Sequence, residues 1–297
     1  MKKDITDLFV LLDDFCAEYD LFRQRQILPK TRKPTRVPGL QISEIITIVL
    51  LFHYSPAKNF KYFYTDYLQQ YQSEFPNLPS YTRFVALQQR CLGHFHALLT
   101  ILCAVAKQTG INYVDSTYIP VCYSKRIYKH KVFKGLAALG KSSMGWFFGL
   151  KLHLIINEKG DLLSAKLTPG NTDDRKPLRQ MSDKLTGLLF GDKGYISQTL
   201  FNDLYARGLK LVTGIKAKMQ NKFLPLREKI LLRKRSIIET VNGVLKTDFQ
   251  IVHTRHRSFI NGFIHIFSTL IAYALKSNKP AIKFNNRPSA KQDFWLN

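Results

Sequence analysis

Three carboxylates occur in segments of the sequence that are otherwise largely apolar. Asp115 falls within the apolar, β-branched run INYVDSTYI, Asp192 ends the apolar run GLLFGD, and Glu239 lies in KRSIIETVNGVLK. A carboxylate buried in such a run needs hydrogen-bond donors or a metal ion. Two strand-borne aspartates and a helix-borne glutamate could hold two magnesium ions, which prefer oxygen ligands. Two such ions ~3.5–4 Å apart activate an attacking oxygen and stabilise a leaving oxygen on phosphorus.

Basic side chains accompany these acids. The 297-residue chain has 45 Lys and Arg against 21 Asp and Glu, and its net charge of +24 indicates a polyanionic partner, nucleic acid or an anionic membrane surface. On a helix, Arg235 and Lys246 fall on the same polar stripe as Glu239. Together with Lys193 they could hold a phosphate backbone beside the metal ions. Trp146 could stack on an unpaired base, although tryptophan is more often a core residue.

Each acid also has a plainer interpretation. Glu239 could pair with Arg235 at i−4, as on many surface helices. Asp115 could be a core acid satisfied by hydrogen bonds, and Asp192 a turn or cap residue. The scarcity of acids favours the functional interpretation, because over residues 75–157 Asp115 is the only carboxylate among ten Lys and Arg. The three acids also occur in an order of elements that suits a shared site.

The elements that must position these residues fall into two parts. Residues 1–107 are mostly helical and aromatic-rich, whereas the β-branched and aromatic runs after Gly110 are typical of strands. In the first part, helices are expected over residues 1–20, 43–54 and 81–107, the last broken only at Gly93. Arg23–Pro38, with six basic residues, three prolines and no acids, predicts a basic arm or linker.

The second part predicts a mixed α/β sheet flanked by helices. Strands are expected over residues 111–123, 146–157, 161–170, 187–192 and 209–215, and helices over residues 173–185, 197–207, 229–249 and 259–276. Asp174 is placed to favour the N-terminus of the first of these helices. The resulting order, β-β-β-α-β-α-β-α-α, indicates an α/β layer fold with one hairpin in the sheet.

Two further patterns suggest other functions and are set aside. Residues 135–142, GLAALGKS, satisfy the P-loop pattern, but the basic run RIYKHKVFK precedes them where a buried strand is needed, and an aromatic run follows where a helix is needed. We therefore expect a flexible basic loop. The apolar run over residues 259–275 contains Asn261 and His265, which raise the cost of membrane insertion and favour a buried helix. Aspartates near the N-terminus argue against a signal peptide, so a cytoplasmic protein is expected.

The blocks that carry the three acids resemble a known family. YVDSTYIPVC, LLFGDKGYIS and RKRSIIETVNGVLK are similar to the three blocks of DDE transposases of bacterial insertion sequences, and most similar to the group numbered nine-eighty-two. Arg235, Glu239 and Lys246 match the R-(3)-E-(6)-K signature of related groups. The tyrosine expected three positions before the arginine is Leu232 here. The resemblance covers roughly residues 35–275.

This resemblance implies a ribonuclease H-like fold, with the first aspartate on the first strand, the second after the fourth strand and the glutamate on a later helix. It implies that Asp115, Asp192 and Glu239 bind two Mg²⁺ or Mn²⁺ ions, and that Arg235 and Lys246 contact DNA near the cut. It also implies cleavage at the ends of the element by water, followed by attack of the freed 3′-hydroxyl on target DNA.

The sequence therefore predicts a DNA transposase with a helical, DNA-binding domain over residues 1–107. A ribonuclease H-like catalytic domain over residues 108–280 and a basic tail over residues 281–297 complete the expected organisation. Its partners would be double-stranded DNA (terminal inverted repeats and target) and a second copy of the chain, at the bacterial nucleoid and not at a membrane. A metal-dependent nuclease without strand transfer and a non-catalytic DNA-binding protein are the alternatives. The net charge is compatible with all three of these functions, so only the three acids can distinguish between them.

Overall fold

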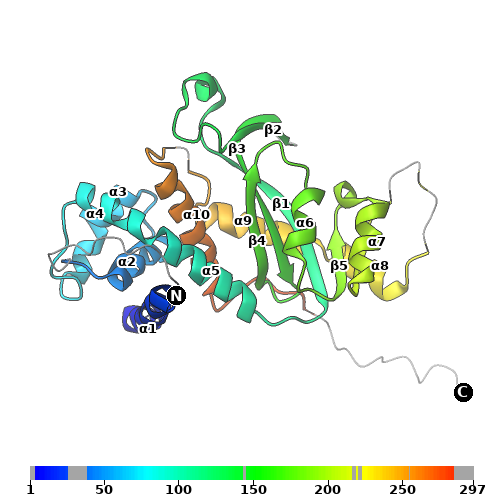
Figure 1. Cartoon of the computed structure of the whole chain (residues 1–297), viewed down its shortest axis with the longest axis horizontal. Coiled ribbons are helices and arrows are strands. Elements are labelled where there is room, and N and C mark those ends of the chain that lie inside the picture. Colours follow the sequence, from blue (N-terminus) through cyan, green and yellow to red (C-terminus); the bar gives the residue numbers. More distant parts are fainter. Residues whose placement is uncertain are drawn as a thin grey trace, which may run out of the picture.

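The fold was analysed in a computed structural model, which describes residues 4–25, 39–142, 145–215, 219, 223–253 and 255–283. Most of the predicted basic arm and most of the predicted basic tail lie outside the described residues. The remaining elements form a helical part and a sheet-bearing part that pack side by side (Figure 1).

The helical part contains five α-helices, with bounds α1 Ile5–Arg25, α2 Ile42–Tyr54, α3 Phe60–Thr65, α4 Tyr81–Leu87 and α5 Leu92–Val105. The long helix predicted over residues 81–107 is wrong as a single element. A 3₁₀ turn over Gln88–Cys91 separates α4 from α5, and Gly93 lies inside α5. Gln88 and Cys91 are buried in this turn, so packing sets the break at a place that Gly93 marks only approximately.

The sheet has six strands, with bounds β1 Ile111–Pro120, β2 Ala138–Ser142, β3 Gly145–Asn157, β4 Leu162–Pro169, β5 Gly187–Gly191 and β6 Leu209–Thr213. Their order is β2-β3-β1-β5-β6, and β4 pairs with β3 beside β2. The β1, β2 and β4 pairings with β3 are antiparallel, whereas β1–β5 and β5–β6 are parallel. The predicted mixed sheet is confirmed.

Strand β2 corrects the prediction of a flexible loop over residues 135–142. Ala138–Ser142 pairs antiparallel with Gly145–Gly149 at the start of β3. No helix begins at the Lys-Ser pair, so the geometry that a P-loop needs is absent from residues 135–142. The strand was missed because its short, glycine-containing sequence has no local β pattern and depends on its partner.

Helices cover both faces of the sheet, with bounds α6 Arg175–Met181, α7 Gln198–Ala206, α8 Leu226–Arg233, α9 Ser236–Thr247 and α10 Phe259–Ala274. The single helix predicted over residues 229–249 is two helices, because the chain breaks at Lys234 and Arg235 between α8 and α9. The break gives α9 a direction of its own and places Arg235 at its N-cap.

Alternate residues of the central strands enter two separate cores, as the two-residue period of a strand requires. Tyr113 of β1 and Leu154 of β3 join a large core with α9, α10 and the N-terminal helices. Val114 and Ile155 join a smaller core with α6 and α7 on the other face. The sheet is thus buried between two helical layers (Figure 1).

Helix α10, which contains the apolar run suspected of membrane insertion, packs against α5 and α2 within the large core. Gly262, Ser268 and Thr269 of this helix are buried among apolar side chains. Among the described residues, no helix combines the length and apolar character that crossing a membrane requires.

Candidate active site

The register between β1 and β5 brings Asp115 and Asp192 to equivalent positions. The parallel pairing of these strands ends at Tyr113 and Phe190, whose rings stack with centroids 5.3 Å apart. Asp115 and Asp192 each come two residues later, so both side chains leave the strands on the face of that ring pair. The two carboxylates therefore lie just beyond the point where the pairing of β1 with β5 ends, Asp115 within β1 and Asp192 directly after β5.

Asp115 is a mostly buried carboxylate with a donor from helix α9. Its Oδ2 accepts a hydrogen bond of 3.1 Å from Asn242 Nδ2. Burial raises the pKa of the Asp115 carboxyl to about 6; the negative charges of Asp192 and Glu239 add to the rise, and the Ser116 N–H and the Arg235 guanidinium oppose it. The three acids are thus close enough to influence one another electrostatically, which requires positive charge nearby if all three are ionised.

Helix α9 carries Glu239 over this end of β1. Its apolar side packs into the core through Ile237, Ile238, Val241 and Leu245. Arg235 Nη2 donates a hydrogen bond of 2.5 Å to Glu239 Oε1, and the Glu239 side chain is 55% exposed. The plain i−4 pairing is therefore present, but Glu239 also borders a pocket that contains Asp115.

This pocket, which we call the acid pocket, has a volume of about 490 Å³. Three carboxylates (Asp115, Asp174 and Glu239) and three ammonium groups (Lys141, Lys151 and Lys246) line it, together with Asn242 and other neutral residues. The pocket lies where β1 has passed the end of its pairing with β5. A cavity lined by both signs of charge suits a phosphodiester held beside cations.

A divalent cation fits the oxygen donors of this site, since hard cations prefer carboxylates. Asp115 is the buried member, and its like-charged neighbours would be relieved by a cation. In the described part of the chain, however, no three His, Cys, Asp or Glu side chains converge closely enough to hold a metal. The carboxylates are engaged elsewhere, because Glu239 turns to Arg235 and Asp192 Oδ1 accepts a 2.9 Å hydrogen bond from the Gly194 N–H.

The other predicted site residues are distributed around the acid pocket. Lys246 lines it, with Nζ 4.4 Å from the centroid of the Tyr118 ring, and burial lowers the pKa of Lys246. Lys193 is exposed and lies outside the pocket, with its side chain beside Gly214. The alternative of a core tryptophan is wrong, because Trp146 is 63% exposed.

Trp146 borders a second pocket of about 580 Å³, which has Phe147 as a lining residue in common with the acid pocket. Two basic residues, Lys58 before α3 and Arg255 before α10, line this second pocket with Tyr123. It therefore lies between the sheet and the segments that precede α3 and α10. The exposed aromatic ring of Trp146 and these cations thus lie near the acid pocket, since both pockets share Phe147 as a lining residue.

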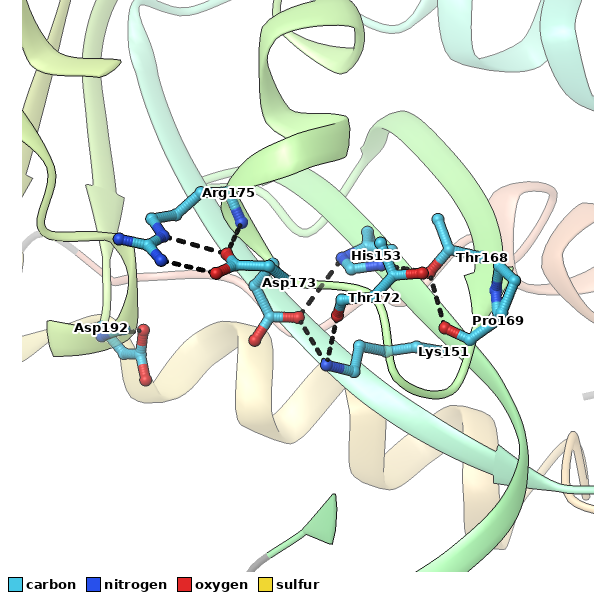
Figure 2. Close-up of polar contacts among 10 residues, drawn as sticks. Lys151, His153, Thr168, Pro169, Thr172, Asp173, Arg175 and Asp192 are labelled. Carbon is cyan, nitrogen blue, oxygen red and sulfur yellow. Dashed lines mark hydrogen bonds and ion pairs between the residues drawn. The ribbon is translucent and has the colours of Figure 1, made fainter. Parts of the chain in front are cut away.

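Asp174, Lys151 and His153 are residues of this region that the sequence reasoning missed (Figure 2). Lys151 Nζ lies 3.1 Å from Asp174 Oδ1, and His153 Nδ1 lies 3.7 Å from the same oxygen. A signal was present in the sequence, since Lys151 and His153 are polar residues two apart within the apolar strand GWFFGLKLHLIIN. Polar residues at that spacing share one face of a strand.

Tyr195 is buried near Asp115, Asp192 and Asp174. Its side chain is 1% exposed, and its phenol oxygen has no hydrogen-bond partner among the described residues. Burial strongly raises the pKa of Tyr195, and the charges of Asp174, Asp115 and Asp192 add to the rise. Asp174 therefore joins the predicted acids in this region, although the sequence did not predict it as a site residue.

Comparison with known structures supports this arrangement of elements. The piggyBac transposase in its synaptic complex with hairpin DNA is similar with a TM-score of 0.52 and 8% identity, over 92% of this chain and 72% of that one. The Mos1 strand transfer complex aligns over 89% of this chain and 86% of that one at 12% identity, but its TM-score of 0.24 is too low to carry an argument. The piggyBac similarity confirms the predicted fold class, a ribonuclease H-like mixed sheet flanked by helices.

The family was established from the sequence. No curated protein matches the chain. A family model described as a transposase DDE domain matches residues 105–259, which is more than half of the 297 residues and includes all three predicted acids. The chain therefore belongs to the DDE transposase family and is a DDE-type transposase.

Proposed function

We propose that this transposase cleaves the ends of its own insertion sequence and joins the freed 3′-hydroxyl to target DNA, as a member of the group numbered nine-eighty-two. The observation that carries the proposal is the shared register of Asp115 and Asp192 beyond the Tyr113–Phe190 pair, with α9 bringing Glu239 to the same end of the sheet. The proposal follows from family membership together with this geometry.

Asp115, Asp192 and Glu239 would hold two Mg²⁺ or Mn²⁺ ions. Such ions, when bound, activate the attacking oxygen and stabilise the leaving oxygen on phosphorus. Asn242 orients the Asp115 carboxylate by donating a hydrogen bond to Oδ2. Arg235 orients Glu239 by donating a hydrogen bond to Oε1, and its guanidinium could also contact a phosphate of the bound strand.

The remaining predicted residues serve as DNA contacts in this proposal. Lys246 and Arg235 border the scissile region, and Lys193 contacts the backbone farther out. Trp146, exposed at the second pocket, stacks on a base that has left the duplex. The helical residues 1–107 bind the terminal repeat, residues 108–280 perform the chemistry, and the basic tail adds phosphate contacts. Two copies of the chain hold the two ends.

The test is a cleavage and joining assay with duplexes that carry the short inverted repeats bracketing the coding sequence. We expect the wild type to nick these ends with Mg²⁺ or Mn²⁺ and to join them to a target plasmid. Asp115→Asn, Asp192→Asn and Glu239→Gln should each lower single-turnover cleavage by at least about 100-fold, or about 3 kcal/mol of transition-state stabilisation.

The matched control is Asp183→Asn, an equally conservative change at a carboxylate that is 73% exposed and pairs with Arg207 away from the acid pocket. It should retain wild-type cleavage. Full metal-dependent activity in any of the three acid variants would overturn the catalytic assignment. Cleavage by the wild type without joining under any condition would identify a nuclease instead.

A further inference from the structure

Lys151 and Asp174 line the acid pocket on the wall opposite α9, and the proposed chemistry uses neither of them. Lys151 lies in β3 directly across from Tyr118 of β1, in the antiparallel register of the two strands. Asp174 immediately precedes α6. Both border the same pocket as Asp115 and Glu239.

The Lys151 ammonium is held from two sides. Its Nζ donates a hydrogen bond of 2.9 Å to the Thr172 carbonyl oxygen and lies 3.1 Å from Asp174 Oδ1 (Figure 2). An ammonium has three N–H groups. The Thr172 carbonyl oxygen accepts a hydrogen bond from one of them, and Asp174 contributes an ion pair, so N–H capacity remains for the pocket that the side chain lines. The Lys151 side chain is only 16% exposed, which restricts it to this conformation.

Asp174 is not needed to cap its own helix. Its side chain makes no cap hydrogen bond, and the neighbouring Asp173 Oδ1 instead accepts from the Arg175 N–H at 2.9 Å. The Asp174 carboxylate turns toward β3, where Oδ1 faces both Lys151 and His153. Its position is therefore explained by the groups on β3 and not by α6.

The buried His153 side chain lies next to the Asp174 carboxylate. The ring is 1% exposed, and its Nε2 lies 2.8 Å from Thr168 Oγ1, which fixes the orientation of the imidazole. Its Nδ1 and Asp174 Oδ1 face each other at 3.7 Å, and neither has a hydrogen-bond partner among the described residues. The series of contacts from Thr168 through His153 and Asp174 thus ends on the Lys151 ammonium, which borders the acid pocket.

Two ammonium groups flank the same tyrosine. Lys246 lies over the Tyr118 ring from the side of α9, with Nζ 4.4 Å from the ring centroid, and Lys151 is the cross-strand neighbour of Tyr118 from β3. The sugar-phosphate backbone of a DNA strand that passes Asp115 would therefore meet a cation on either side of β1. Stability alone does not explain why the Lys151–Asp174 ion pair borders a charged pocket, because ion pairs that water can reach contribute little to the free energy of unfolding.

We propose that Lys151 binds a phosphate of the DNA strand held in the acid pocket, and that Asp174 is the positioning residue that aims this ammonium. The inference rests on the proposed function, since the phosphate belongs to the strand that is cleaved. Lys151 grips the strand opposite Lys246. Asp174 acts through Lys151 and does not itself touch the DNA.

The experiment measures DNA binding without cleavage. Full-length protein is titrated in EDTA against duplexes carrying the terminal repeat, in which one phosphate at a time near the cleavage site is replaced by a neutral methylphosphonate. In the wild type, we expect one or two substitutions to weaken binding about tenfold. Lys151→Met should weaken binding of the unmodified duplex to a similar extent, reduce the salt slope by about one, and abolish the penalty at one of those positions.

Three further variants test whether the binding defect is specific to the Lys151 ammonium. Lys151→Arg should restore part of the affinity, Asp174→Asn should reproduce a smaller version of the Lys151→Met defect, and exposed Lys159→Met should behave as wild type. Thermal unfolding of each variant checks that the fold is retained. The Mg²⁺ concentration for half-maximal cleavage should change by less than threefold in Asp174→Asn.

Two results would overturn the inference. One is an unchanged methylphosphonate penalty pattern in Lys151→Met. The other is a metal requirement raised tenfold or more in Asp174→Asn, which would make Asp174 a metal ligand. Because binding is measured in EDTA, its outcome is independent of whether Asp115, Asp192 and Glu239 catalyse cleavage. Suppose that Lys151→Met loses the methylphosphonate penalty while Asp115→Asn still cleaves DNA. That result would refute the proposed function but would support the contact between Lys151 and a phosphate.

Discussion

Asp115 combines burial with a single side-chain donor, which makes it the most sensitive acid of the site. Its pKa of about 6 arises from burial first and from neighbouring acids second. The side-chain hydrogen bond from Asn242 therefore stabilises the ionised form that a metal ligand must adopt. This hydrogen bond joins Asp115 to a residue 127 positions away in the chain.

Replacing Asn242 tests this dependence at the level of one hydrogen bond. Asn242→Ala removes the donor to Asp115, and a hydrogen bond to a charged group contributes about 1.5–3 kcal/mol. We expect single-turnover cleavage at neutral pH to fall about tenfold or more. In the matched change Asn202→Ala, on exposed α7, the lost partner is Gln198 and cleavage should be unaffected. Equal rates for Asn242→Ala and wild type would show that Asp115 needs no such donor.

At the scale of elements, β3 organises the site because it pairs with three strands. It pairs with β1 along one edge and with β2 and β4 along the other. Gly149 lies where all these strands approach closely, and a Cβ added there would lie 2.1 Å from the Ile119 carbonyl oxygen. Only the absence of a side chain lets β1 and β3 keep the register that holds Asp115 and Lys151 in place.

Gly149→Ala should therefore destabilise the protein. Overlap with the backbone of β1 forces the strands apart, and overpacking of this kind costs about 1–3 kcal/mol. Equilibrium urea unfolding measures the change. The paired control is Gly243→Ala on α9, where a Cβ meets nothing within 4 Å, and a helical Gly→Ala change stabilises by about 0.5–1 kcal/mol. Shifts of the same sign in both variants would contradict this account.

At the scale of the whole molecule, one apolar core joins the N-terminal helices to the sheet, and a histidine cluster lies at their junction. His53 of α2, His265 of α10, and His253 and His256 of the segment between α9 and α10 have neighbouring rings, with His53–His265 and His256–His265 centroids 5.4 and 5.3 Å apart. Burial lowers the pKa of His265 to about 4, that of His256 to about 2, and that of His53 as well. The junction therefore requires neutral imidazoles.

This junction predicts a loss of stability in mild acid. In the unfolded chain these histidines take up protons near pH 6.5, whereas in the folded chain they remain neutral. The unfolded state therefore binds more protons between pH 6.5 and 4. As a result, the free energy of unfolding decreases as the pH falls through this range. At pH 5, His265 alone would account for up to about 2 kcal/mol. Urea unfolding at pH 7.5 and 5 measures the loss.

His265→Gln should weaken this pH dependence, because glutamine does not titrate and can still donate to the Gln250 carbonyl oxygen that His265 Nε2 now contacts. Exposed His96→Gln on α5 should keep the wild-type pH dependence. An equal free energy of unfolding at pH 7.5 and 5 in the wild type would refute the role assigned to the cluster.

Much of the architecture could be predicted because its signals are local. The apolar runs around Asp115 and Asp192 indicate strands, and the amphipathic repeat around Glu239 indicates a helix. Element bounds were less well predicted where packing sets them, as at the 3₁₀ turn over Gln88–Cys91 and at the break between α8 and α9. The short strand β2 was missed because it exists through its pairing with β3.

The sequence by itself determined the family, the fold class and the order of the three acids, since these depend on residue types and spacings within short segments. Only the tertiary structure brought Asp174 and Lys151 into the acid pocket, bonded Asn242 to Asp115 and exposed Trp146. These features depend on contacts between segments that are distant in sequence. A local pattern such as the polar pair Lys151 and His153 indicates which residues share a face of a strand, but the partners that they meet are set by strand register and helix packing.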